Sequence, residues 1–264
     1  MESIDLDSTA QSNIRELIEK RKALDFLVDV TFYIPCYNEE EAIYRTLSKV
    51  RDGLRDTGIT YELLIYNDGS QDRTQSEAER FAKDNPDVLV NIVTNKKRRG
   101  LGYNYISGAF VGVGKYYMMI FGDDSETSET LHDILSKRGQ ADIIIPYFGL
   151  GDNRNFGRRN LSRLFTCIVN LINGYDIRYY NGVVLHERTN VMRHAPSSTG
   201  FGYQAELLGI LLDHGKTYLQ VPISNQDRTQ GFSRAFHIQN IFSVTHSLLQ
   251  IFLRRIRNVL WPMD

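Results

Sequence analysis

Cysteine is scarce in this sequence. The 264 residues include only Cys36 and Cys167, and neither has a second cysteine or a histidine at the spacing of metal ligands. This count excludes a disulfide-stapled scaffold and a cysteine-based zinc site. Both cysteines stand among apolar residues, so we predict that both pack in the core. We accordingly expect a reducing, cytoplasmic location.

Long hydrophobic runs and an excess of charge are also missing. No apolar run reaches the ~20 residues that a membrane-spanning helix needs, and the N-terminus is too polar for a signal peptide. The formal net charge is -1, which argues against a nucleic-acid binder. The six histidines do not repeat at metal-ligand spacing, so we interpret them as structural or surface residues. We expect a globular protein that does not cross a membrane by itself, although it could lie on one.

Strand-like and helix-like segments alternate along most of the chain. Runs rich in β-branched and aromatic residues predict buried strands at 26–35, 62–66, 88–93, 116–121 and 143–146. Amphipathic patterns predict helices at 39–54, 74–82 and 103–113. Continuously apolar strands that alternate with helices are typical of an α/β fold with a mostly parallel sheet covered on both faces.

Polar turns follow three of these predicted strands. They are Tyr37-Asn38-Glu39, Asn67-Asp68-Gly69 and Gly122-Asp123-Asp124. Ligands of open parallel sheets bind outside the carboxyl ends of the strands. The three turns therefore predict a binding site at one edge of the sheet.

The third turn, Asp123-Asp124-Ser125-Glu126, has the chemistry of a metal site. Hard divalent cations take oxygen ligands, and Mg²⁺ is often held by one or two carboxylates together with substrate phosphates. A metal there would neutralise charge on a departing diphosphate. Asp and Ser also cap helices well, so a solvated turn or a helix cap is the competing interpretation.

The order and spacing of these motifs resemble those of family 2 glycosyltransferases, which have the GT-A (Rossmann-like) fold. The resemblance is carried by IPCYNEEEAI at 34–43, YNDGSQDRT at 66–74 and the acidic turn. It implies that Pro35, Tyr37, Glu39 and Asp68 contact the base of a nucleotide donor. Gly100, in a Gly-x-Gly turn before a helix, would line the donor site.

The acidic turn corresponds to the Asp-x-Asp of that family, with one departure. Gly122 stands where the family has its first acid. The resemblance implies that Asp124 keeps the role of metal ligand for Mg²⁺ or Mn²⁺ and that Glu126 can be a second ligand. Asp123 is then either a substitute ligand or a contact of the donor sugar.

The downstream half is similar to the dolichol- and polyprenol-phosphate sugar transferases. The similarity rests on a succession of short motifs: Arg158, Arg159 and Arg163 on a helix, Gly202-Tyr203-Gln204-Ala205-Glu206, and Arg228 through Ser233 to Arg234. Together with the first half, it covers roughly residues 32–234. It implies that Gln204 and Ser233 belong to the substrate site.

A lipid-phosphate acceptor has a physical consequence for such a site. Two phosphate-bearing molecules meet, so cations besides the metal are needed, and the arginine fork suits phosphate oxygens. Arg158, Arg163, Arg228 and Arg234 are the candidates. A phosphate acceptor is already anionic, whereas a sugar hydroxyl acceptor needs a base to take its proton. Glu206 is then the candidate base, or alternatively a structural carboxylate at a helix start.

Three parts are predicted along the chain: a polar helical arm at 1–26, the GT-A domain at 27–234 and an amphipathic helical segment at 235–264. The last segment places apolar residues at helical spacing, followed by Arg254, Arg255, Arg257 and Trp261. It either packs on the parent domain or a dimer partner, or lies in a membrane interface.

These observations favour an inverting glycosyltransferase that moves a sugar from a nucleotide diphosphate donor, uridine slightly ahead of guanosine, to a polyprenol phosphate. A saccharide hydroxyl is the alternative acceptor. A nucleotidyltransferase or nucleotide-sugar hydrolase is less favoured, because no glycine-rich phosphate loop lies near the N-terminus. Gly122 keeps open a non-catalytic nucleotide-sugar-binding partner.

Overall fold

A computed structural model describes residues 28–149, 156–198, 200, 202–223 and 238–261. The strands are β1 (Val28–Cys36), β2 (Tyr61–Asn67), β3 (Leu89–Thr94), β4 (Gly114–Met119), β5 (Ile143–Phe148), β6 (Leu185–Glu187) and β7 (Tyr218–Ile223). The helices are α2 (Ile43–Leu54), α3 (Thr74–Asp84), α4 (Leu101–Val111), α5 (Ser128–Leu135), α6 (Phe156–Asn173), α7 (Arg188–Arg193), α8 (Tyr203–Asp213) and α9 (Ile238–Leu260).

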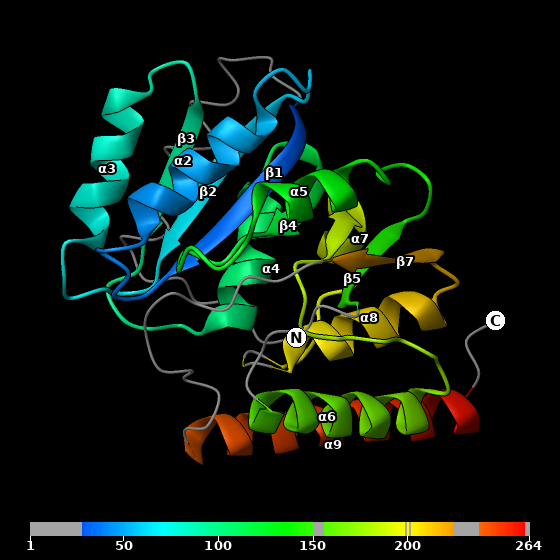
Figure 1. The fold of residues 1–264 in the computed structure, drawn as a ribbon. Coiled ribbons are helices and arrows are strands. Elements are labelled where there is room, and N and C mark those ends of the chain that lie inside the picture. Colours follow the sequence, from blue (N-terminus) through cyan, green and yellow to red (C-terminus); the bar gives the residue numbers. More distant parts are fainter. Residues whose placement is uncertain (1–27, 150–155, 199, 201, 224–237, 262–264) are drawn as a thin grey trace.

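One seven-stranded sheet runs through the molecule in the order β3-β2-β1-β4-β6-β5-β7 (Figure 1). The strands β1 to β4 are parallel, and β5 pairs in parallel with β7. The short strand β6 is antiparallel to both of its neighbours. The prediction of an α/β fold with a mostly parallel sheet is therefore confirmed.

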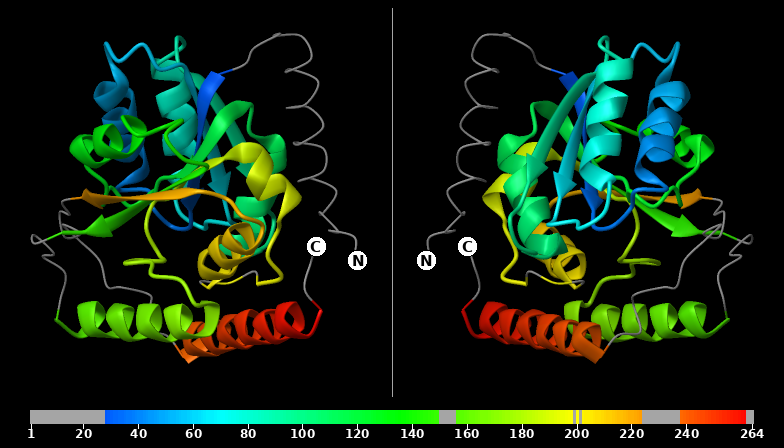
Figure 2. Two further views of the ribbon diagram at one scale, coloured as in Figure 1. Left: turned by 90° about the vertical axis from the view of Figure 1, so that its right-hand side faces the viewer. Right: turned by 90° about the vertical axis from the view of Figure 1, so that its left-hand side faces the viewer.

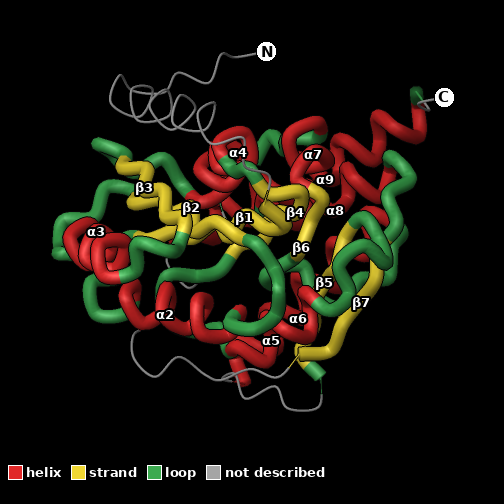
Figure 3. The backbone as a smooth tube through the Cα atoms, turned by 90° about the horizontal axis from the view of Figure 1, so that it is seen from above, coloured by secondary structure: helices red, strands yellow, loops and turns green. Residues whose placement is uncertain are grey.

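The strands are apolar on both sides because helices cover both faces of the sheet, as Figure 3 shows from above. On one face, Phe32 and Ile34 of β1 pack with the inner residues of α2, α3 and α5. On the other face, Tyr33 of β1 packs with α4, α7 and α8. Successive strand residues point to opposite faces, so one strand supplies both cores.

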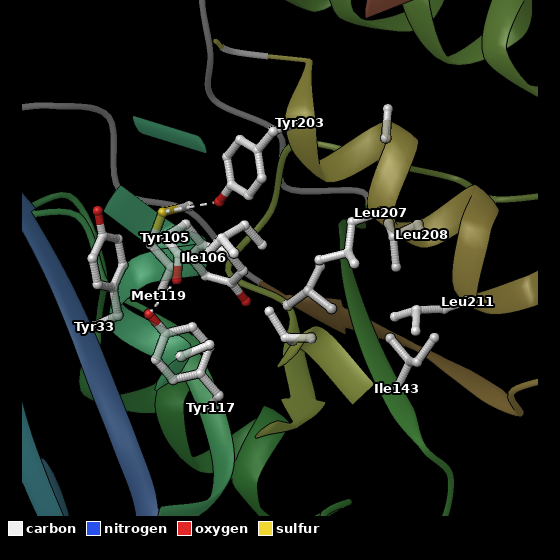
Figure 4. Close-up of a cluster of buried hydrophobic side chains, with 14 of the residues drawn as sticks. Tyr33, Tyr105, Ile106, Tyr117, Met119, Ile143, Tyr203, Leu207, Leu208 and Leu211 are labelled. Atoms are coloured by element: carbon white, nitrogen blue, oxygen red, sulfur yellow. Dashed lines mark hydrogen bonds between the residues drawn. The ribbon is translucent and has the colours of Figure 1, made fainter. Parts of the chain in front are cut away.

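The second core contains a group of buried tyrosines that joins β1, β4, α4 and α8 (Figure 4). The Tyr117 hydroxyl donates a hydrogen bond to the Tyr105 carbonyl at 2.8 Å. Gly108 lets α4 come this close, because a Cβ there would lie 2.4 Å from the Tyr117 hydroxyl and 2.9 Å from the Tyr33 ring. Burial raises the pKa of the tyrosines at 33, 105, 117 and 203 well above the usual value. These side chains stay neutral and fix α4 and α8 to the sheet.

The helices α6 and α9 lie side by side as a separate layer beneath α8 (Figures 1 and 2). The packing of α9 on α8 depends on two glycines. A Cβ at Gly202 would lie 2.2 Å from the Ser247 Cβ, and one at Gly209 would lie 2.4 Å from the Arg254 guanidinium. Arg254 also bonds to the Asn173 side chain at the end of α6, at 2.6 Å. Within the described residues, no helix is long and apolar enough to cross a membrane.

Some expectations differ from the structure or fall outside it. Cys36 is buried as predicted, but Cys167 is exposed, because it faces outward on α6. The predicted arm at 1–26 lies outside the described residues, as do Arg228, Ser233 and Arg234. The predicted boundaries at 26/27 and 234/235 also lie outside the described residues and stay predictions.

Candidate functional site

The three polar turns meet at one edge of the sheet, as their positions predicted. The ladder of parallel strands continues into them through backbone hydrogen bonds. Asp68 N donates to the Cys36 carbonyl at 2.9 Å, and Asn95 N donates to the Asn67 carbonyl at 2.9 Å. On the other side of β1, Ile120 N donates to the Tyr33 carbonyl at 2.9 Å, just before the acidic turn. The turns after β1, β2 and β4 are therefore neighbours in space.

Short polar side chains join the turn after β1 to the turn after β2. Asn38 N donates to the Ser70 hydroxyl at 3.0 Å, and Gln71 N donates back to the Asn38 side chain at 2.9 Å. Glu39 N donates to the Thr74 hydroxyl at 2.8 Å. Asn38 has a φ of 56°, a left-handed conformation that Asn tolerates better than most residues. The backbone around the predicted donor contact Glu39 is thus fixed from the neighbouring turn.

Asp68 is buried and accepts three hydrogen bonds. Its Oδ1 accepts from Asn95 Nδ2 at 2.9 Å and from Arg99 N at 2.8 Å, and its Oδ2 accepts from Gly100 N at 3.1 Å. Gly100 immediately precedes α4 with a φ of 95°, which glycine adopts without strain. The predicted base contact Asp68 therefore also fixes the start of α4. Sequence reasoning missed Asn95, which bridges Asp68 and Asn104.

Aromatic and cationic side chains gather beside these turns. Tyr37 is partly exposed, and the Arg98 guanidinium lies 4.4 Å from the centroid of its ring. The Arg99 guanidinium lies 5.1 Å from the Tyr103 ring in the same way. A cation over an aromatic face is attractive and holds both groups in place. The site therefore presents positive charge next to the predicted base contacts.

The departure at Gly122 has a steric cause. A Cβ at this position would lie 2.9 Å from the Pro35 carbonyl oxygen and 3.6 Å from the Cys36 Cβ. The chain leaving β4 passes too close to the end of β1 for a side chain. The family's first acid is thus absent where β1 leaves no room for it.

Asp124 faces helix α2. Its Oδ1 lies 2.5 Å from Lys49 Nζ, and its Oδ2 lies 3.4 Å from Arg45 Nε. Its backbone N donates to the Thr46 hydroxyl at 2.9 Å, and its φ is 62°. The left-handed backbone turns the side chain onto α2, where two cations neutralise it.

Glu126 lines the same small cleft between α2 and α5 as Asp124 and Lys49. Burial of its carboxyl group raises the pKa to about 7, while a hydrogen bond from Ser125 and the charge of Lys49 act in the opposite direction. Asp123 does not line this cleft. It is partly exposed, and its Oδ1 accepts from Ser125 N at 3.2 Å.

The carboxylates of the acidic turn differ in how well they could hold a metal ion. In this arrangement, Asp124 and Glu126 do not fit a divalent ion, because the ammonium group of Lys49 pairs with Asp124 and its charge acts on Glu126. Asp123 fits, since a single carboxylate can hold Mg²⁺ together with substrate phosphates. Among the described residues, no group of three His, Cys, Asp or Glu is arranged to bind a metal. The prediction of Asp124 as a ligand requires its ion pair with Lys49 to open.

On the acceptor side, Gln204 and Glu206 are both buried in α8. Gln204 Nε2 donates to the Gly182 carbonyl at 2.7 Å. The two carboxylate oxygens of Glu206 accept from Ser197 N and Ser198 N, each at 2.9 Å. Both side chains therefore hold loops against the start of α8.

Of the four predicted phosphate-binding arginines, the structure describes the side chain of Arg163 alone, so their grouping stays a prediction. Arg163 is exposed on α6, and the side chain of Arg158 on the same helix is outside the described set. The structure shows instead a polar pocket of about 420 Å³ between α8 and α9. Arg193, Arg257 and Glu206 line it. Sequence reasoning missed this pocket, since residues 193 and 257 are distant in the chain and belong to no motif.

Comparisons with known proteins bear on this arrangement. The sequence model described as Glycosyl transferase family 2 matches residues 31–198. Undecaprenyl-phosphate mannosyltransferase of Micrococcus luteus is 27% identical over 212 residues, which are 76% of this chain and 85% of the relative. Polyprenol monophosphomannose synthase of Mycolicibacterium smegmatis is 28% identical over 219 residues, which are 76% of this chain and 78% of the relative.

A solved structure has the same fold. It is glucosyl-3-phosphoglycerate synthase from Mycobacterium tuberculosis in complex with Mn²⁺, uridine-diphosphate-glucose and phosphoglyceric acid. The TM-score is 0.64 at 15% identity, and the match covers 92% of this chain and 83% of the other. At this identity the likeness establishes the GT-A architecture.

Proposed function

The chain belongs to glycosyl transferase family 2, and from that premise we propose that it is an inverting hexosyltransferase that moves a sugar from a nucleotide diphosphate donor to a polyprenol phosphate. The observation that carries the acceptor class is the pair of relatives named for polyprenol-phosphate mannosyl transfer, each of which matches 76% of the chain. Peripheral placement on the cytoplasmic face of a membrane follows from a lipid acceptor.

The donor base lies, in this proposal, at the joined turns after β1 and β2. Tyr37 with Arg98 gives an aromatic face held by a cation, and Glu39 stands on a backbone fixed by Thr74. Pro35 is partly exposed near the end of β1, and Asp68 orders the Gly100 turn. These contacts exist before any ligand arrives, so binding costs little reorganisation. We favour uridine as the base, because the solved neighbour of the same fold holds uridine-diphosphate-glucose.

A divalent metal, Mg²⁺ or Mn²⁺, would be held by Asp123 of the acidic turn. The solved neighbour is a complex with Mn²⁺ and uridine-diphosphate-glucose. Such an ion, when bound, neutralises charge on the leaving diphosphate. Asp124 and Glu126 then keep the turn against α2 through Lys49, unless the ion pair opens on donor binding.

The transfer is a single displacement. A phosphate oxygen of the acceptor attacks the anomeric carbon, the bond to the diphosphate breaks, and the configuration at that carbon inverts. The attacking oxygen is already anionic, so no base is needed. The position of Glu206 supports this branch, because both of its oxygens are engaged by the Ser197 and Ser198 amides. Positive charge for the donor diphosphate and the acceptor phosphate would come from Arg99 and Arg163. The side chains of Arg158, Arg228 and Arg234, which lie outside the described set, would add to it.

The test is a transfer assay with purified full-length protein, Mn²⁺, uridine and guanosine diphosphate sugars, and a short-chain polyprenol phosphate in detergent. Mass spectrometry of the organic phase should detect a sugar-phosphate lipid. Slow donor hydrolysis without a lipid product would move the acceptor to a saccharide hydroxyl and make Glu206 the base. Metal-dependent nucleotide binding with no turnover on any acceptor would instead support a non-catalytic partner.

Two variants separate the roles of the acidic turn. Asp123→Ala should abolish metal-dependent transfer while the fold persists. Asp124→Ala should chiefly lower thermal stability, since it leaves Lys49 without its carboxylate partner. If Asp124→Ala abolishes transfer in a fully folded protein and Asp123→Ala does not, the metal assignment returns to Asp124. Asp87→Ala, an exposed carboxylate at the start of β3, is the matched control.

A further inference from the structure

Helix α9 exposes apolar side chains on its outer side. On its inner side Ser247, Ile251 and Arg254 are buried, with Ser247 against Gly202, just before α8, and Arg254 against Gly209 of α8. The outward side chains are Leu249, Phe252, Ile256, Val259 and Leu260, which are 40% to 67% exposed, followed by Trp261 at 69%. A helix on the surface of a soluble domain normally turns polar and charged side chains to the solvent. The exposed apolar side chains of α9 therefore form a face that needs a partner.

Helix α6 extends this face. Its exposed side chains include Phe156, Leu161, Leu164 and Leu171, the last of them 84% exposed. The two helices lie side by side, and no other described element lies on their far side in Figures 1 and 2. We call these exposed apolar residues of α6 and α9 the outer apolar face. Contiguous exposed apolar surfaces of this kind mark interaction sites.

The charge around the outer apolar face has one sign. Neither α6, with 18 residues, nor α9, with 23, contains an Asp or a Glu. Arg163 is exposed and Arg255 is partly exposed, whereas Arg257 lines the pocket between α8 and α9. Arg254 is the exception, because it is buried against Asp213. Apolar side chains suit the boundary between headgroups and acyl chains of a membrane, and neighbouring arginines suit the phosphates of anionic lipids. Trp261 at the end of the helix is also typical of such an interface.

We infer that the outer apolar face docks on a membrane that contains anionic phospholipid. Leucine and phenylalanine side chains enter the boundary between headgroups and acyl chains, and the arginines meet lipid phosphates. A second copy of the chain would bring arginines against arginines, with no carboxylate in the described part of either helix to pair with them. The inference rests on the peripheral placement proposed above and names the surface responsible for it.

The experiment is co-sedimentation of the full-length protein with vesicles of phosphatidylcholine, alone or with 30% phosphatidylglycerol (about the anionic fraction of many membranes). The unmodified protein should bind the anionic vesicles. The variant Leu249→Gln/Phe252→Gln/Ile256→Gln should bind about tenfold more weakly, because each substitution replaces an apolar side chain that would be buried in the membrane with a polar amide. Arg163→Gln/Arg255→Gln should lose most of its preference for phosphatidylglycerol.

The matched control is Phe110→Gln on α4. Phe110 is 51% exposed, as is Leu249, but it lies outside the α6–α9 layer. This variant should bind vesicles like the unmodified protein. Equal vesicle binding by the triple variant and the control would overturn the inference. So would a dimer in analytical ultracentrifugation that the triple variant dissociates.

The transfer assay in detergent distinguishes this inference from the proposed function. The triple variant should keep transfer to a short-chain acceptor in detergent and lose transfer to the same lipid presented in vesicles. If the unmodified protein does not bind vesicles but transfers the sugar in detergent, only the inference about the docking surface is overturned. If vesicle binding depends on the outer apolar face but no lipid phosphate accepts the sugar, the docking inference is supported and the proposal of a lipid-phosphate acceptor is refuted.

Discussion

The edge of the sheet and the α6–α9 layer present different surfaces to their surroundings. At the edge, the side chains of Asn38, Ser70 and Asp68 turn inward and bind backbone amides. In the layer, the polar groups also turn inward, but they leave an apolar exterior. The first arrangement fixes a site for a small ligand before it binds. The second leaves a broad face whose partner must be supplied from outside.

The edge should be the more sensitive region, and Asp68→Ala should have the largest effect. It removes the acceptor of three hydrogen bonds and leaves the amides of Arg99 and Gly100 without a partner. We expect a loss of about 2–4 kcal/mol in the free energy of unfolding. The start of α4 would also shift, and a misplacement of about 1 Å can cost about 100-fold in kcat/KM.

Chemical denaturation and donor titration by calorimetry would measure both effects. Asp87→Ala, whose carboxylate is exposed, should leave stability and donor affinity unchanged. A folded Asp68→Ala protein with normal donor affinity would show that the edge does not depend on this carboxylate.

Gly122→Asp tests how tightly the end of β1 packs on the acidic turn. It restores the acid of the family, but its Cβ would lie 2.9 Å from the Pro35 carbonyl oxygen. We expect a loss of about 1–3 kcal/mol in stability and no gain in activity. Gly149→Ala, where a Cβ meets only ordinary contacts at 3.8 Å, serves as control in the same thermal melts. Increased transfer by Gly122→Asp would contradict the steric explanation.

Gly202→Ala addresses the attachment of the layer. The added Cβ would lie 2.2 Å from the Ser247 Cβ, so α9 must move away from α8. We expect a loss of about 1–2 kcal/mol in the free energy of unfolding, followed by urea denaturation. The double variant Gly202→Ala/Ser247→Gly should recover much of it, because the second change removes the clashing atom. Purely additive losses would mean that the two residues do not limit the packing.

The smallest effect concerns pH and the core that joins the two regions. His186 of β6 is fully buried, and burial lowers its pKa to about 3 from the usual 6.5. Because its folded pKa is depressed, the unfolded chain takes up the proton first, and stability falls as the pH drops below about 6.5. Between pH 7 and pH 6, the unmodified protein should lose about 0.7 kcal/mol more than His186→Leu. Parallel pH dependence of the two melting temperatures would exclude this cause.

Much of the edge could be predicted from the sequence because doubly buried strands are continuously apolar and their turns are polar. The three turns and the parallel order came from that pattern alone. Helix α2 was expected to begin at Glu39 but begins at Ile43. The reason is that Glu39 and Glu40 belong to the turn, where their amides bind Thr74 and Asp72. Strand β6 was missed, since three residues carry no period.

Side-chain direction was harder to predict than position. Asp124 lies against Lys49 with a left-handed φ of 62°, and no residue pattern signals that angle; its role as a metal ligand stays a prediction. Cys167 was expected in the core because leucines and isoleucines surround it. On α6 the apolar residues occur on both sides of the helix, so apolar neighbours do not indicate burial there.

The close approach at Gly122 also limits how this sequence can change over generations. One nucleotide separates many glycine codons from an aspartate codon, so the acid typical of the family is a single mutation away in the gene. The Pro35 carbonyl stands in the space that this acid would need. That single mutation is therefore disfavoured here, and a second change that loosens the end of β1 would make room for the acid.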